Sequence, residues 1–354
     1  MKLGRIHVVI IVILILIAVF LVGYYGVGKQ QKNMMNPYYL GKIVPEDIIH
    51  NISLNNLFMQ NVSVYENGAY VSTYGPTDIA MNRNKTELYV LGSKNILVIN
   101  ASNYEVVGDI RGVDFPVGIQ FSPVGNLAYV TDIATYTLIV INTTTNKVVT
   151  YISLDSMPVR DTITPDGRYV YVPEYYSNEV VVVNSTNNSI SDMISSLGPT
   201  SVAIDGYNNY AYITERKGIQ IVNTESMANI KNISMPQYTE FIYVSPDNKS
   251  VYVTSAVANT ISVINASLNK IVAVIPMDTY PVDVAFTPDS KFAYVSRYES
   301  NTISIINMTT MKVEATMNTT AFPNFVAFSE NGNRAYLLNE EEEKITVIKT
   351  GVYN

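Results

Sequence analysis

The groups in this sequence that could do chemistry are carboxylates and arginines, because the other usual catalytic and ligating side chains are missing. The chain contains no Cys and only two His, His7 and His50, near its N-terminus. Ser–His–Asp triads, imidazole metal clusters and thiol nucleophiles are therefore excluded from the rest of the chain. No phosphate-binding glycine loop, dinucleotide fingerprint or calcium loop occurs either. We accordingly expect no catalytic residue, no metal site and no cofactor, although carboxylate chemistry stays possible.

The pair Arg160-Asp161 stands out among the charged residues because it interrupts a repeated pattern. The pattern is eighteen residues long and occurs seven times, and its fifth position holds Ile or Val in six copies but Asp161 in the third. A buried carboxylate is costly unless it is paired. Asp161 therefore either pairs locally with an Arg or with backbone amides, or it contacts a ligand or an ion. The copies begin at Gly75, Phe115, Met157, Gly198, Tyr238, Tyr280 and Phe322.

The repeat identifies the elements that must position these groups. Its fifteenth position is Tyr in all seven copies, and successive copies of this Tyr lie 40 to 42 residues apart. In the second copy, the runs VGIQF, LAYVT, TLIVIN and VVTYI are separated by polar loops and turns. Short strands at this period predict four-stranded blades, and blades close into a ring that protects their edges. We therefore predict an all-β, seven-bladed β-propeller over residues 67–354.

The ends of the repeat region predict how the ring closes. The seventh repeat has three strands, because the sequence ends soon after KITVIK. The missing fourth strand is expected at residues 69–74, AYVSTY, which precede the first repeat as a fourth strand precedes every other repeat. An open solenoid is the alternative, but it would need a polar cap at both ends, and neither end resembles one.

The segment before the propeller predicts a membrane anchor. Residues 8–23 carry no charge, and Tyr24, Tyr25 and Val27 extend the apolar run to about 20 residues, which can cross a ~30 Å hydrocarbon layer as a helix. A cleaved signal peptide is the alternative, although it would have a shorter apolar run and an A-x-A-like exit. The predicted organisation is a short cytoplasmic N-terminus at 1–7, a transmembrane signal-anchor helix at 8–28, an extracytoplasmic linker at 29–66 and the propeller at 67–354.

Twelve Asn-x-Ser/Thr sequons indicate that the propeller lies outside the cell. Five of them share one position, the end of the third strand of a repeat. Glycosylation would favour Asn there, and so would avoidance of carboxylates that titrate at acid pH; a purely structural turn is the remaining explanation. The predicted glycosylation sites are Asn51, Asn61, Asn84, Asn100, Asn142, Asn184, Asn187, Asn232, Asn248, Asn265, Asn307 and Asn318.

The second strand of each repeat carries a motif that resembles the YVTN-type β-propeller repeat family. It reads YVTD, YVPE, YITE, YVTS, YVSR, YVLG and YLLN, and turns such as SPVG, TPDG and SPDN precede it. The third strand ends in VIN, VVN, IVN or IIN, where the family usually has VID. Membrane-attached members resemble archaeal surface-layer proteins. The resemblance covers about residues 69–354 and implies the fold, but it implies no function, because propellers host unrelated activities.

By the geometry of this family, the fourth positions of the repeats surround one mouth of the central channel. Asp78, Arg160, Ser201 and Asp283 occupy four of them and share no residue type, so a sevenfold-repeated ligand site is not expected. The run of four Glu at 340–343 is expected to be a solvated loop, or else to bind a divalent cation or a basic partner. The candidate ligand- or partner-binding residues are Asp78, Arg160, Asp161, Glu174, Asp283 and Arg297.

Two functions fit these observations. The first is a single-pass membrane protein whose C-terminal propeller lies outside and acts as a binding or scaffold module for protein or glycan partners at the cell surface. The second is an extracytoplasmic lactonase-like or lyase-like enzyme that uses carboxylates and Arg at the mouth. Convergence of these groups on one cavity would favour the enzyme, and mutual pairing would favour the scaffold. Nucleic acid is excluded as a partner, because residues 46–354 carry a net charge of −12.

Overall fold

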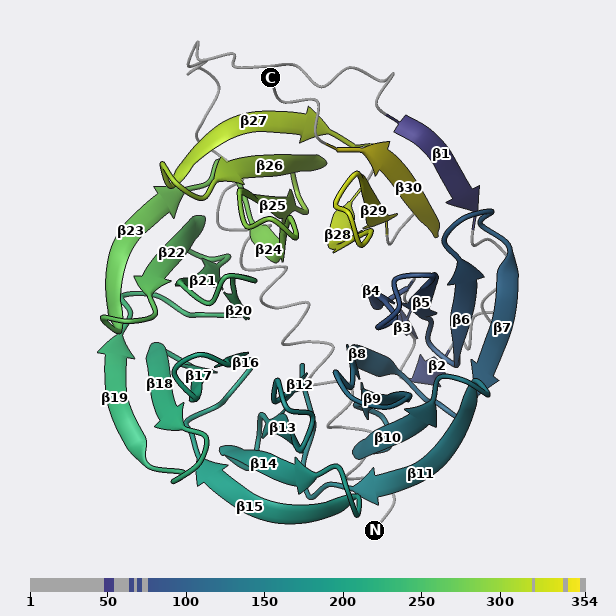
Figure 1. The fold of residues 1–354 in the computed structure, drawn as a ribbon, viewed down its shortest axis with the longest axis horizontal. Coiled ribbons are helices and arrows are strands. Elements are labelled where there is room, and N and C mark those ends of the chain that lie inside the picture. The colour runs from purple at the N-terminus through teal and green to yellow at the C-terminus, as the bar shows by residue number, and fades with distance from the viewer. Residues whose placement is uncertain are drawn as a thin grey trace. The chain divides into compact units, whose positions relative to one another are not determined.

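A computed structural model describes residues 48–53, 64–66, 69–71, 76–319, 322–339 and 343–350. The chain divides into two units, Met1–Leu40 and Gly41–Asn354, and every described residue belongs to the second. In that unit, seven four-stranded antiparallel sheets follow one another around a ring (Figure 1). The predicted all-β, seven-bladed propeller is thereby confirmed. No helix within the described ranges is long and apolar enough to cross a membrane, and the predicted anchor at residues 8–28 lies outside those ranges.

Each blade is a meander whose first strand lies nearest the centre and whose fourth strand lies at the rim (Figure 1). Blades 1 to 3 are β4(Asp78–Met81), β5(Glu87–Leu91), β6(Asn95–Asn100), β7(Val106–Arg111); β8(Pro116–Phe121), β9(Leu127–Asp132), β10(Thr137–Asn142), β11(Lys147–Ser153); and β12(Thr162–Ile163), β13(Tyr169–Glu174), β14(Glu179–Asn184), β15(Ser189–Ser195). Blades 4 and 5 are β16(Val202–Asp205), β17(Tyr210–Glu215), β18(Gly218–Asn223), β19(Asn229–Ser234); and β20(Ile242–Val244), β21(Ser250–Ser255), β22(Thr260–Asn265), β23(Lys270–Pro276). Blade 6 is β24(Pro281–Phe286), β25(Phe292–Arg297), β26(Thr302–Asn307), β27(Lys312–Asn318), and blade 7 contains β28(Pro323–Phe328), β29(Arg334–Asn339), β30(Lys344–Lys349).

The two middle strands of each blade are buried on both faces, and this explains their composition. In β14, the run Val180–Val183 is entirely buried, whereas the rim strand β15 buries only Ile194. A strand covered on both faces reads as a continuous apolar run, and the β-branched Val and Ile suit such a position. The core of the protein therefore lies between consecutive blades.

Blade 7 receives its fourth strand from the N-terminal side of the chain, but from a segment other than the predicted one. The strand β1(Ile48–Ser53) pairs antiparallel with β30, with Asn51 opposite Thr346 (Figure 1). The strand β3(Ala69–Val71) pairs instead with β2(Val64–Glu66) in a separate two-stranded sheet. The prediction that residues 69–74 supply this strand is therefore wrong for 69–71, and residues 72–74 lie outside the described part of the chain.

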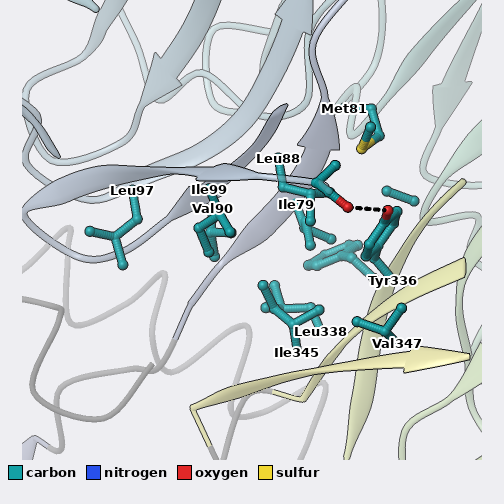
Figure 2. Close-up of a cluster of buried hydrophobic side chains, with 13 residues drawn as sticks. Ile79, Met81, Leu88, Val90, Leu97, Ile99, Tyr336, Leu338, Ile345 and Val347 are labelled. Atoms are coloured by element: carbon teal, nitrogen blue, oxygen red, sulfur yellow. Dashed lines mark hydrogen bonds between the residues drawn. The ribbon is translucent and has the colours of Figure 1, made fainter. Parts of the chain in front are cut away.

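The junction between blade 7 and blade 1 is a continuous apolar core (Figure 2). Leu88 and Val90 of β5 and Ile99 of β6 belong to one buried cluster with Leu338 of β29 and Val347 of β30. Since these residues are about 250 positions apart in the sequence, this packing joins the two ends of the repeat region.

The repeated Tyr connects neighbouring blades through its hydroxyl group. Its ring is buried in every blade, and in four blades the hydroxyl lies within hydrogen-bonding distance of the turn between the third and fourth strands of the next blade. Tyr212 donates to Asn269 Oδ1 at 2.7 Å, and Tyr336 closes the series by reaching Ala101 O at 3.5 Å in blade 1. The seven residues are Tyr89, Tyr129, Tyr171, Tyr212, Tyr252, Tyr294 and Tyr336.

Removing this hydroxyl should destabilise the protein only where it has a partner. Tyr212→Phe loses the bonds to Asn269 Oδ1 and Ala266 O, so we expect a loss of about 1–2 kcal/mol in the free energy of unfolding. Tyr252→Phe is the matched control, because the Tyr252 hydroxyl is buried without a hydrogen-bond partner. Urea unfolding of both variants checks this, and equal losses would contradict a role for the inter-blade bond.

Candidate functional site

The side chain of Arg160 crosses the centre of the ring. From blade 3, its Nη2 lies 2.9 Å from Asp78 Oδ1 in blade 1, and its Nη1 lies 4.0 Å from Asp283 Oδ1 in blade 6. The guanidinium lies between two aromatic rings, at 5.1 Å from the ring centre of Phe241 in blade 5 and 4.0 Å from that of Phe325 in blade 7. All five residues occupy the fourth position of their repeats, so one arginine links five blades at the centre.

Backbone amides hold the two carboxylates that face Arg160. Asp78 Oδ1 accepts a bond from its neighbour Ile79 N at 2.8 Å, and Asp283 Oδ2 accepts one from Val326 N of blade 7 at 2.9 Å. Burial nevertheless raises the pKa of Asp78 to about 6, against the lowering effect of Arg160, and it raises the pKa of Asp283 as well. Burial also lowers the pKa of Arg160. The nearby carboxylates raise it by more, so the net pKa of the guanidinium is raised. The cluster therefore depends on its one cation.

A hydroxyl group at the seventeenth position of the repeat fixes the backbone of the fourth position in three blades. The amides of Ser201, Phe241 and Asp283 donate to the hydroxyls of Thr214, Thr254 and Ser296, at 2.8, 3.0 and 2.9 Å respectively. We call this bond the hydroxyl clamp. It gives a physical reason for Thr or Ser in the third place of motifs such as YITE and YVSR.

Blade 3 lacks the hydroxyl clamp, and its inner strand leaves the regular ladder. Pro173 occupies the seventeenth position and has no hydroxyl. Val159 N still bonds to Pro173 O at 3.0 Å, and pairing with β13 resumes at Thr162, but Arg160 forms a bridge to Ser201 of blade 4 instead. This irregularity lies where Arg160 and Asp161 enter the centre, opposite Pro173 of the motif YVPE.

Asp161 is buried without a partner from any other described residue. It is 2% exposed, and neither carboxylate oxygen has a hydrogen-bond partner in another residue. Burial raises its pKa well above the usual range. Gly118 of blade 2 leaves room beside it, because a Cβ there would lie 3.2 Å from Asp161 Oδ1 and 3.0 Å from Thr131 Oγ1. Arg160 forms its ion pairs with Asp78 and Asp283. It therefore does not form an ion pair with its neighbour Asp161.

Glu174 and Arg297 do not join this cluster. Both occupy the eighteenth position, where side chains bind the connections between blades. Glu174 accepts bonds from Asp155 N and Ser177 Oγ, and Arg297 pairs with Asp278 at 3.0 Å. Asp132 likewise accepts hydrogen bonds from the backbone amides of Asp114 and Thr135. Of the six predicted residues, the structure therefore brings together Asp78, Arg160, Asp161 and Asp283.

The aromatic part of the site was not among the residues predicted from the sequence. Phe241 and Phe325 share the fourth position of the repeat with the charged residues, and this shared position is the sequence signal that identifies them. Tyr243, which lies beside Asp283, follows two residues further along the inner strand of blade 5. Residues 340–342 of the predicted acidic run lie outside the described ranges. No group of three or more His, Cys, Asp or Glu suited to a metal ion occurs among the residues described.

The sequon residues at the ends of third strands make turns. Asn142 Oδ1 accepts bonds from the amides of Thr144 and Thr145, and Asn307 Oδ1 does the same with Thr309 and Thr310. These are Asx-turns, for which Asn is a favoured residue. The amide nitrogen of Asn142 donates no hydrogen bond to a described residue, so the turn occupies the oxygen and leaves the nitrogen accessible to modification. The ten sequon residues from Asn84 to Asn318 are all half-buried or exposed.

Comparisons with known proteins support the fold alone. No family model matches the chain, and no curated protein does. The structure of hydrazine synthase from Kuenenia stuttgartiensis is similar over 82% of this chain and 100% of its own, with a TM-score of 0.72 and 18% identity. The Cps50 (Swd1) β-propeller domain of Myceliophteria thermophila is similar over 78% of this chain and 97% of its own, with a TM-score of 0.71 and 9% identity. Membership of the YVTN-type family stays a prediction.

Proposed function

We propose that this protein is a membrane-anchored, cell-surface propeller that acts as a binding or scaffold module for protein or glycan partners. The observation that carries the proposal is the pairing of the central charges with one another. Arg160 is engaged by Asp78 and Asp283, so these three groups pair with one another across blades 1, 3 and 6. The lactonase-like or lyase-like alternative required two carboxylates and an Arg within hydrogen-bonding range of one cavity, whereas Asp161 is the one carboxylate among the described residues that line the cavity beside Arg160.

The sequons support an extracytoplasmic location. Most of them lie on one of the two faces of the propeller. Asn84, Asn187 and Asn248 and the five Asx-turn positions lie in turns after first or third strands, which belong to one face in an antiparallel meander. Loops after second strands and connections between blades belong to the other face, which we call the bare face. In the proposal, residues 8–28 anchor a glycoprotein of the YVTN, surface-layer type, and glycans keep partners away from the first face.

The bare face presents exposed apolar side chains over blades 3 to 5. They are Tyr176, Leu197, Tyr238 and Val257, which are 39% to 57% exposed. Hydrogen bonds connect their loops, because Gly198 N donates to Asn178 Oδ1, and Ser255 Oγ donates to Tyr238 O. Exposed aromatic and aliphatic groups that lie close together are typical of protein interaction sites. We therefore assign partner binding to this face.

A matched pair of variants tests the assignment. Leu197→Arg on the bare face should lower recovery of cross-linked partners from native membranes at least tenfold, because a charge would be buried in the contact. Leu268→Arg is the control, since Leu268 is similarly exposed, at 61% against 56%, but lies in a third-to-fourth-strand turn. Equal recovery from both variants, or a loss confined to Leu268→Arg, would refute the assignment. Glycopeptide mass spectrometry of the same membranes tests sequon occupancy.

A further inference from the structure

A cavity of about 260 Å³ lies beside Arg160, among the inner strands of blades 2 to 6. Its polar lining consists of Gln120, Arg160, Asp161, Thr162, Ser201 and Tyr243. Aliphatic and aromatic side chains complete the wall, among them Ile242 and Phe286. Thr162, Tyr243 and Phe286 keep partial exposure, so the cavity communicates with solvent. Its size suits a small metabolite better than a drug-sized ligand.

The polar atoms at this cavity are not satisfied by the residues that the structure describes. Both oxygens of Asp161 are buried without a hydrogen-bond partner in another residue. Arg160 Nη2 is close to Asp78 but is not aligned with it as a hydrogen bond. Buried polar groups without partners are rare in native proteins, because each has lost its hydrogen bonds to water without replacement. Several of them around one cavity point to a ligand that supplies the missing partners.

The charge of the cluster indicates the sign of that ligand. Arg160 forms ion pairs with Asp78 and Asp283, and Asp161 has no ion pair of its own within the described part of the chain. Asp161 experiences the repulsion of Asp78 together with the attraction of Arg160, and burial outweighs both effects. A cation placed against Asp161 would favour the ionised carboxylate that burial disfavours, whereas an anion would oppose it further.

We infer that the cavity binds a small organic cation, an ammonium compound whose charged group contacts Asp161 and whose carbon groups contact Tyr243 and Phe286. Aromatic faces attract such cations, and the adjacent carboxylate adds a direct charge pair. A metal ion is a poorer fit, because the described residues supply no set of three ligating side chains here. The inference goes beyond the proposed function, since the cavity lies within the ring and the partner surface lies on the bare face.

The test measures binding of choline to the full-length protein in detergent, with 3,3-dimethyl-1-butanol as the neutral analogue of the same shape. We expect choline to raise the melting temperature in a saturable way and to bind at least tenfold more tightly than the alcohol. Asp161→Asn should weaken choline binding at least tenfold. The control Asp289→Asn alters an exposed ion pair with Lys291 and should leave binding unchanged.

Folding and pH provide two further readouts. Asp161→Val should fold and be at least as stable as the parent, because six other repeats hold Ile or Val there, yet it should not bind choline. Binding should strengthen as pH rises, since the cation requires ionised Asp161, whose neighbours Asp78, Asp283, Arg160 and Tyr243 also face the site. Equal binding of the neutral alcohol, binding retained by Asp161→Asn, or a dissociation constant above about 10 mM would overturn the inference. The partner-recovery experiment is unaffected by any of these results.

Discussion

Replacing Arg160 with Met should destabilise the propeller by about 3–5 kcal/mol, because the substitution leaves Asp78 and Asp283 buried without a cation. Met keeps most of the volume between Phe241 and Phe325, so packing should contribute little to the loss. Urea unfolding at pH 8 measures the change. An Arg160→Met variant as stable as the parent at that pH would show that the two carboxylates do not need the guanidinium.

The loss of stability caused by Arg160→Met should increase with pH. The direction of this dependence follows from the raised pKa of Asp78. The pKa is about 6 in the folded protein and 3.8 for the unperturbed group, so the folded state binds the proton more tightly. The resulting stabilisation is complete below pH ~4 and disappears as pH rises through about 6. Without Arg160 the folded-state pKa rises further, so the variant should approach the parent at pH 5 and fall furthest behind at pH 8.

A triple variant separates the loss of charge balance from any other effect. Arg160→Met combined with Asp78→Asn and Asp283→Asn has no buried charge left among these three positions. We expect it to recover most of the lost stability at pH 8 and to show little dependence on pH. Failure to recover would assign the defect of Arg160→Met to packing against the two Phe rings.

Deleting residues 1–53 should prevent the propeller from remaining a folded monomer, whereas deleting residues 1–46 should be tolerated. The longer deletion removes β1 and exposes the edge of β30 in blade 7. An unpaired strand edge promotes association, and the lost ladder bonds contribute roughly 0.5–1.5 kcal/mol each. Size-exclusion chromatography and thermal melts compare the two products.

Peptides added in trans identify the strand that blade 7 requires. A peptide of residues 47–54 should restore a monomeric, folded product to the 1–53 deletion by adding a strand to the β30 edge. A peptide of residues 68–75, which covers the strand expected from the sequence, should not. Rescue by the second peptide alone would mean that β1 is dispensable for blade 7.

The parts of the fold that repeat could be predicted, because seven copies average out local ambiguity. The column of Tyr residues and the four strands of each blade follow from periodicity alone. The closing strand occurs once, and both 48–53 and 69–74 are short segments suited to strands, so spacing to the first repeat favoured the wrong one. Pairing with β30 depends on the position of blade 7, which no local pattern encodes.

The central site could be predicted in part for the same reason. Asp161 was recognisable because an acid replaced Ile or Val in an otherwise apolar column. The partners of Arg160 were not, since Asp78 and Asp283 lie 82 and 123 residues away and meet it only after the ring has formed. Glu174 and Arg297 were included because charge alone does not distinguish a residue at the centre from one that binds a loop.

The hydroxyl clamp holds the backbone at the fourth position of the repeat and does not involve the side chain at that position. Ser201, Phe241 and Asp283 have unrelated side chains, yet the clamp holds their amides at nearly the same distance, because it uses only the backbone. In these three blades, side chains at the fourth position differ in type while the strand that carries them keeps the same backbone bond. A ring built in this way can acquire new specificities by exchanging a few central residues, and it offers the same freedom to a protein engineer.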